Sequence, residues 1–113
     1  MKIDGKAKSV AIFIGESDKW HGQSLDDAIV ARAHAEGIAG ATVFHGVEGF
    51  GANSVIHRAS FFKLSHDRPV VIMMVDHADR IDPFLIILDE MVQEGMVVTW
   101  EVNVEKYVHG EDR

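Results

Sequence analysis

Three groups of residues have types and spacings that could do chemistry. The first is a glycine cluster, Gly46, Gly49 and Gly51, which directly follows a short apolar segment. Because glycine lacks a side chain and adopts positive φ readily, backbone N–H groups in such a cluster can approach and surround an anion. The same cluster is equally typical of an ordinary turn. A dinucleotide-binding fingerprint is excluded, since these glycines do not open a helix directly after the first predicted strand.

The second group is a charged stretch that contains Glu16, Asp18, Lys19 and His21. It follows a buried apolar segment, and such strand ends often carry ligand-facing groups beside the start of a helix. The stretch offers acids, a cation and an imidazole whose charge can switch near neutral pH. The alternative is a solvated loop that Trp20 anchors to the core.

The third group is the histidines, since imidazole is a good ligand for Zn, Ni and Cu. No two of them stand four residues apart or in an H-x-H pattern, so a metal site would have to gather distant residues. The best candidate set is Asp18, His21 and His57. The seven histidines are at positions 21, 34, 45, 57, 66, 77 and 109.

Catalytic patterns are missing from the sequence. Ser54, Ser60 and Ser65 occur without a nucleophile elbow, and many carboxylates fall on predicted helix surfaces. His57 and Arg58 could bind an anion or cap a short helix. We therefore expect that the protein is not an enzyme.

The regular elements that must position these residues can be read from hydrophobic periodicity and from turn residues. A connector over residues 49–65 separates the second strand from the third, which Pro69 opens. The predicted strands cover residues 9–15, 41–47, 70–76 and 98–105, and the predicted helices cover residues 24–37 and 79–94.

Helix ends are predicted from single residues. Ser24 is the expected N-cap of the first helix, and Asp27 three residues later complements the helix dipole. Gly37 fits a left-handed C′ position, and Gly95 is the expected stop of the second helix.

The order βαββαβ with right-handed crossovers predicts an α+β, ferredoxin-like sandwich: a four-stranded antiparallel sheet with both helices on one face. Strand residues on the other face are apolar too, which implies burial against another copy of the chain. The 113 residues fit a single domain, with residues 1–7 and 108–113 expected to be flexible ends.

Composition limits the partners. The net charge of -7 disfavours nucleic acid and anionic lipid surfaces. The absence of cysteine excludes disulfides and thiolate sites, and no apolar run is long enough to insert into a membrane. We expect a cytoplasmic location.

Two segments, residues 37–43 and 47–51, resemble the exit of the first helix, the second strand and the loop base of the PII signal-transduction proteins. The likeness is closer to a prokaryotic PII-like group, domain-of-unknown-function family 190, whose pattern also matches residues 15–22. It covers nearly the whole chain. The resemblance implies a homotrimer that binds effectors in clefts between neighbouring subunits, at the base of the loop after the second strand.

Three differences from the PII proteins change the expected effector. The loop is shorter, Asn53 replaces a nucleotide-contacting Gln, and residues 94–101 replace a glycine-rich basic segment that grips triphosphate. An adenine nucleotide smaller than ATP, such as ADP or AMP, or another small anion therefore becomes the expected effector. From motifs and resemblance together, the predicted ligand-binding residues are Glu16, Asp18, Lys19, His21, Thr42, Gly46, Glu48, Gly49, Gly51, Asn53, His57 and Arg58.

The functional prediction is a PII-like regulator that acts on a partner protein, such as a membrane transporter or an enzyme, through the loop after the second strand. Two alternatives stay open. One is a metal-binding trimer similar in fold to the small cation-tolerance proteins. The other is a ligand-free adaptor that recognises a protein through its loop or the open edge of its sheet.

Overall fold

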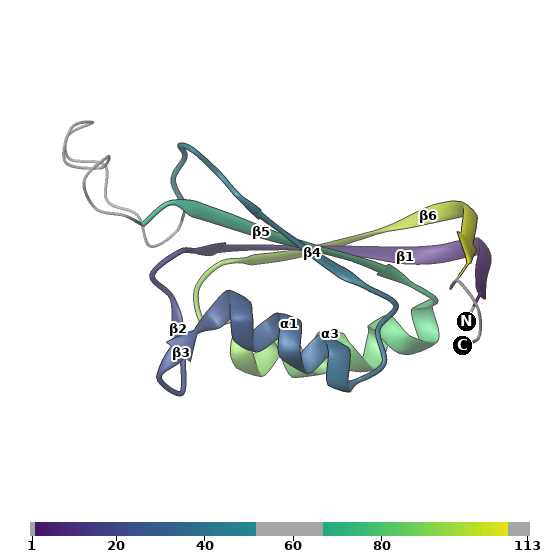
Figure 1. Ribbon diagram of the computed structural model, residues 1–113, viewed down its shortest axis with the longest axis horizontal. Coiled ribbons are helices and arrows are strands. Elements are labelled where there is room, and N and C mark those ends of the chain that lie inside the picture. Colours follow the sequence, from purple (N-terminus) through teal and green to yellow (C-terminus); the bar gives the residue numbers. More distant parts are fainter. Residues whose placement is uncertain (1, 52–66, 109–113) are drawn as a thin grey trace.

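The computed structural model describes residues 2–51 and 67–108 of the chain. A long first strand leads through a small hairpin into a helix, and two further strands, a second helix and a long last strand follow (Figure 1). The elements are β1 (Lys2–Gly15), β2 (Lys19–Trp20), β3 (Gln23–Ser24), α1 (Leu25–Ala35), β4 (Ala41–His45), β5 (Pro69–Asp76), α3 (Ala78–Met91) and β6 (Met96–Val108).

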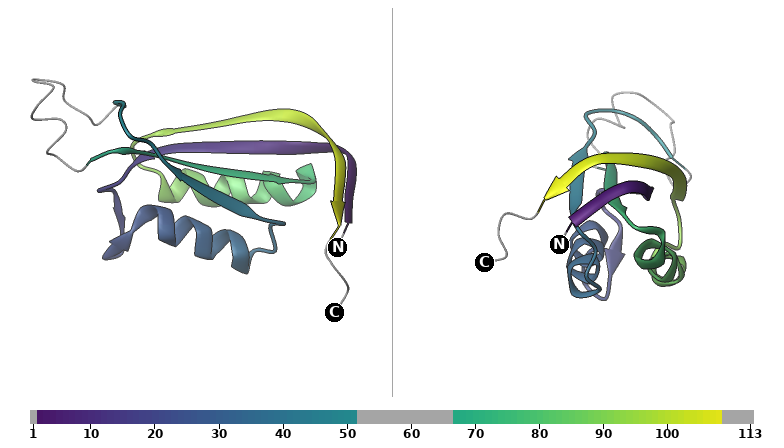
Figure 2. Two further views of the ribbon diagram at one scale, coloured as in Figure 1. Left: turned by 45° about the horizontal axis from the view of Figure 1, so that its top comes forward. Right: turned by 90° about the vertical axis from the view of Figure 1, so that its right-hand side faces the viewer.

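The main sheet has the strand order β4-β5-β1-β6, and every neighbouring pair is antiparallel. The central strand β1 pairs with β5 over residues 8–15 and with β6 over residues 2–13. Figure 2 shows both helices beneath one face of this sheet. The predicted ferredoxin-like α+β sandwich is therefore confirmed, with its four-stranded antiparallel sheet and two helices on one face.

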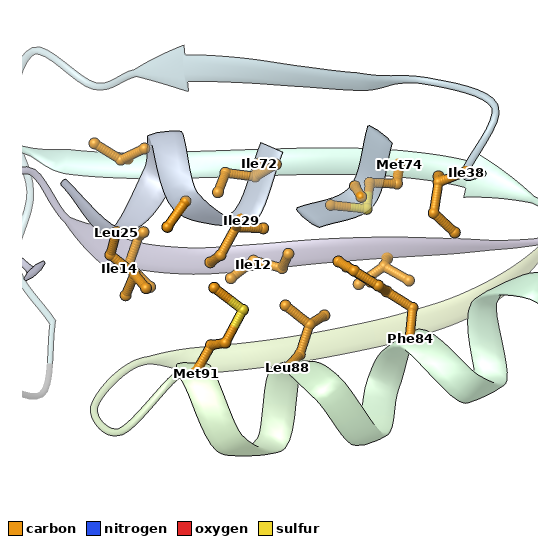
Figure 3. Close-up of a cluster of buried hydrophobic side chains, with 14 of the residues drawn as sticks. Ile12, Ile14, Leu25, Ile29, Ile38, Ile72, Met74, Phe84, Leu88 and Met91 are labelled. Atoms are coloured by element: carbon orange, nitrogen blue, oxygen red, sulfur yellow. The ribbon is translucent and has the colours of Figure 1, made fainter. Parts of the chain in front are cut away.

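The core lies between the sheet and the helices. Alternate residues of a strand point to one face, so Ile12 of β1 and Ile72 of β5 are fully buried against the helices. Helix α3 supplies Phe84, which is 1% exposed and is the largest side chain buried in this way. Figure 3 shows α1 and α3 contributing side chains to this single cluster. No described helix is long and apolar enough to cross a membrane.

The ends of α1 agree only in part with the caps predicted from the sequence. Ser24 is the N-cap, but its side chain makes no capping bond and its hydroxyl donates to Asp26 Oδ1 at 2.8 Å. At the other end, Gly37 has φ 83°, as predicted for a C′ residue. The N–H of Gly37 donates to the carbonyl of His34 and that of Ile38 to the carbonyl of Ala33, which together form a Schellman motif.

The prediction that residues 1–7 are a flexible end is wrong from Lys2 onward. Strand β1 begins at Lys2 because β6 reaches Val108 and pairs with β1 over residues 2–13. Ile3 is only 2% exposed and Ala7 only 6%, so this part of β1 is packed. Val108 ends β6 and is likewise not part of a flexible end, whereas residues 109–113 lie outside the described residues.

Two further boundaries differ from the sequence prediction. The stretch over residues 16–22, expected to be a loop, contains the hairpin β2–β3. Its two central residues, His21 and Gly22, have φ 48° and 86°, the positive values that a type I′ turn requires. Helix α3 ends at Met91 rather than near Glu94, because Val92 already has extended backbone.

A polar cluster around Asp76 connects β5, α3 and β6 with the turn before β4. Asp76, fully buried at the end of β5, accepts hydrogen bonds from the N–H groups of Ala39 and His77 at 2.9 and 2.6 Å. Arg80 of α3 contacts the same carboxylate at 3.5 Å. Tyr107 of β6 donates its hydroxyl to the carbonyl of Ala39 at 3.2 Å. The turn before β4 is thus tied to β5, α3 and β6.

Candidate functional site

A cavity of about 100 Å³ lies where β1 ends, β5 begins and the turn into β6 passes. We call this part of the molecule the loop end, comprising residues 15–24, 46–51, 67–69 and 92–95. The lining combines apolar surface, glycines and carboxylates. Its residues are Phe13, Ile14, Gly15, Asp18, Gly49, Phe50, Gly51, Asp67, Pro69, Glu94 and Gly95.

Two of the lining carboxylates shape the loop that leaves β1. Asp18 Oδ2 accepts the N–H of Gly15 at 3.0 Å, which closes a tight turn over residues 15–18. Asp67 Oδ1 accepts both the hydroxyl and the N–H of Ser17, at 2.9 and 3.3 Å. A Cβ atom on Gly15 would lie 2.6 Å from this Asp67 oxygen, so the close approach requires glycine.

A second hollow of about 210 Å³ lies beside the hairpin β2–β3 and the end of α3. Asp18 and Glu94 line both hollows and therefore stand between them. The second hollow also contains the only described cation of either lining, Lys19. Its residues are Asp18, Lys19, Leu25, Met91, Gln93 and Glu94.

The glycine cluster packs against Pro69. The N–H of Gly46 donates to the carbonyl of Pro69 at 2.7 Å, and a Cβ atom on Gly46 would lie 2.6 Å from Pro69 Cγ. A Cβ atom on Gly49 would lie 3.1 Å from the same carbon. Gly49 and Gly51 line the first cavity, whereas Gly46 does not. Close packing explains the glycine at position 46, because the proline ring occupies the space of any side chain.

The backbone N–H groups at the end of β1 are already used inside the protein. Those of Gly15 and Ser17 donate to the carboxylates of Asp18 and Asp67. Those of Glu16 and Asp18 donate to the carbonyls of Arg68 and Gly15, at 2.8 and 3.1 Å. Together with the N–H of Gly46, five backbone N–H groups of the loop end therefore donate to acceptors within the protein.

The other predicted site residues lie around the cavity rather than in it. Glu16 contacts His45 across the sheet end, with 3.6 Å between Oε2 and Nδ1. His21 is exposed and stacks on Trp20, with ring centroids 4.4 Å apart. Thr42 points to the open face of the sheet, and Glu48 is exposed without lining either hollow.

Asn53, His57 and Arg58 lie outside the described residues, as do the three serines considered above and most of the predicted connector. The alternative metal set of Asp18, His21 and His57 includes one of them. Within residues 2–51 and 67–108, no group of three or more His, Cys, Asp or Glu side chains is placed to hold a metal ion.

Several lining residues were not predicted as site residues. Phe13 and Phe50 appear in the sequence as parts of an apolar strand and a turn. Asp67 and Glu94 are separated from Asp18 by 49 and 76 positions, and only the sheet order brings the three together. No pattern in the sequence indicates that the turn at Gly95 lies next to β1.

An apolar row crosses all four strands on the open face of the sheet, next to the cavity. Phe44 pairs with Val71, Val71 with Phe13, and Phe13 with Met96. Phe13, Phe44 and Met96 are 42%, 51% and 57% exposed. Phe13 also lines the first cavity, so the apolar row and the cavity share a wall.

Comparison with known proteins places these features in a family. Residues 7–104 match the model of DUF190, described as an Uncharacterized ACR. The UPF0166 protein MJ1524 of Methanocaldococcus jannaschii is 34% identical over 102 residues, which cover 89% of this chain and 94% of that protein.

Solved structures of CPII from Thiomonas intermedia K12 share the fold. The apo form, a nitrogen regulatory PII-like protein, has a TM-score of 0.62 at 13% identity and covers 96% of this chain and 100% of its own. CPII bound to ADP and bicarbonate has a TM-score of 0.61 at 16% identity, with 88% of each chain covered.

Proposed function

Because the chain belongs to the DUF190 family and has the fold of PII-like proteins, we propose that it is a PII-like regulatory protein rather than an enzyme. In this proposal it forms a homotrimer that binds a small effector, an adenine nucleotide or a small anion, between neighbouring subunits. It then acts on a partner protein, a membrane transporter or an enzyme, through the loop that follows β4.

The observation that carries the proposal is the apolar row beside the cavity. Single soluble chains rarely expose contiguous apolar patches without a binding role. Burying the exposed parts of Phe13, Phe44 and Met96 would contribute roughly 1 kcal/mol each, taking about half the value of a full side chain. A neighbouring subunit is a fitting cover, because a closed symmetric assembly can bury the same face of every copy.

The shared wall links assembly to ligand binding. Phe13 belongs to both the apolar row and the cavity lining, so a subunit seated on the row would also stand over the cavity. Small-molecule sites are favoured at such interfaces, where apolar walls meet a few polar groups. The bound ADP and bicarbonate of CPII support the class of effector, since that protein shares the fold.

The test is the oligomeric state of two charged variants. Phe44→Glu and Met96→Glu each place a carboxylate in the apolar row. We expect these variants to be monomeric at micromolar concentration, where the wild type stays trimeric. Ile86→Glu is the matched control, because Ile86 is 75% exposed on α3, away from the open face. Analytical ultracentrifugation gives the mass, and circular dichroism confirms folding.

Calorimetric titration with AMP, ADP and bicarbonate tests the effector. We expect binding by the wild type and by Ile86→Glu, and loss of binding by a dissociated variant whose cavity lacks its second wall. A folded wild type that is strictly monomeric, or a monomeric variant that binds as tightly as the wild type, would contradict the proposal.

A further inference from the structure

We propose that the cavity at the loop end discriminates against phosphate, so that an effector enters it with its uncharged part and binds more weakly with each added phosphate. This inference rests on the proposed function, because it concerns the chemistry of the same site. The bound ADP of CPII raises the expectation of a phosphate-holding site. The described residues of this chain do not fit that expectation.

The charge of the lining is the first reason. The described part of the first cavity has three carboxylates, Asp18, Asp67 and Glu94, and no Lys, Arg or His. Lys19 faces only the second hollow, where Asp18 and Glu94 stand beside it. A phosphate that entered the first cavity would therefore meet the like charge of Asp18 and Glu94 at short range, which raises its free energy.

The use of backbone donors is the second reason. Phosphate sites without cations depend on N–H groups that point at the ligand. Here the N–H groups of Gly15, Glu16, Ser17 and Asp18 donate to protein oxygens. The N–H of Gly46 donates to Pro69. The end of β1 and Gly46 thus have no N–H groups left to offset the carboxylates.

The remaining lining suits a flat, uncharged ring. Phe13, Phe50 and Pro69 provide apolar surface, and aromatic side chains stack on heterocycles. Carboxylate oxygens accept hydrogen bonds from ring amino groups. A nucleoside with no phosphate or one phosphate therefore fits the cavity better than a di- or triphosphate.

The experiment compares adenosine, AMP, ADP and ATP by calorimetric titration at low ionic strength. We expect the wild-type affinity to fall in that order, by about fivefold for each added charge, from Coulomb's law at roughly 8 Å with an effective dielectric constant of about 40. Glu94→Gln should restore about fivefold for ADP and ATP while leaving adenosine unchanged. Added salt should reduce these differences.

Asp89→Asn is the matched control. It removes the same charge from an exposed position of α3 that lines neither hollow, so it should not change the order. Asp18→Asn is a second test variant, because an Asn oxygen can still accept the N–H of Gly15. Thermal melting confirms that each variant folds.

The outcomes separate this inference from the proposed function. ATP binding tighter than AMP, or an order that Glu94→Gln and Asp18→Asn leave unchanged, would overturn the inference alone. If the wild type binds no nucleotide but the two variants acquire ADP binding, the nucleotide effector fails and the discrimination stands. If neither the wild type nor the variants bind any of the four compounds, this inference is refuted, and the proposed function then depends on the titration with bicarbonate.

Discussion

The buried carboxylate of Asp76 allows the sharpest prediction of stability. It is 0% exposed and accepts hydrogen bonds from two backbone N–H groups, those of Ala39 and His77, and from Arg80. The two N–H groups use different oxygens, Oδ2 for Ala39 and Oδ1 for His77. Replacement by Ala leaves these two donors without their acceptor and removes the Asp76 contact of Arg80.

The expected losses follow from that count. Each of the two orphaned backbone donors costs about 1–3 kcal/mol, and the lost contact with Arg80 adds little, because the Arg80 side chain is 42% exposed. We therefore expect Asp76→Ala to lower the free energy of unfolding by about 4 kcal/mol, a large part of the roughly 5–15 kcal/mol of an ordinary domain. Asp76→Asn keeps one oxygen and should lose about 2 kcal/mol, because one N–H then faces an amide NH₂.

The assay is urea unfolding followed by circular dichroism at one fixed protein concentration, since association adds to apparent stability. Asp79→Ala is the control, because Asp79 is exposed in the first turn of α3 and should contribute less than about 1 kcal/mol through the helix dipole. A loss below about 1 kcal/mol for Asp76→Ala would refute the view that this carboxylate holds the turn before β4.

Three further substitutions test the local backbone conformation and the helix cap. Gly95→Ala should lower the free energy of unfolding by about 2 kcal/mol or more, because a Cβ atom there would lie 2.5 Å from the Phe13 carbonyl oxygen and φ is +144°. Gly22→Ala is the comparison, since Gly22 also has a positive φ but faces open space. It should cost about 1 kcal/mol in the same unfolding assay. Ser24→Ala should cost less than about 0.5 kcal/mol, below the usual value for an N-cap, because its hydroxyl does not bond the helix N–H groups; a loss above about 1 kcal/mol would contradict this.

Periodicity and turn chemistry were enough to predict the fold. The apolar run over residues 70–76 placed β5 correctly, and Gly37 marked the left-handed end of α1, because both depend on local conformation. The apolar character of both sheet faces was also visible, and Phe13 now faces the open side while Ile12 faces the helices.

What sequence reasoning missed depends on pairing between distant segments. Residues 1–7 were expected to be a flexible end, but residues 2–7 pair with β6, which lies about a hundred positions away. The cavity was missed for the same reason, since Asp67 and Glu94 reach Asp18 only once β5 and β6 flank β1. The glycine cluster was recognised, but the close contact of Gly46 with Pro69 depends on the register of β4 and β5.

The pairing of Lys2 with Val108 brings the two ends of the described chain together, and Figure 1 places them at the far side of the molecule from the hairpin β2–β3. A short linker could therefore join them, and new ends could be opened at the exposed hairpin turn of His21 and Gly22. A fluorescent label or surface anchor attached beside Val108 would likewise lie far from the loop end and leave the cavity unobstructed.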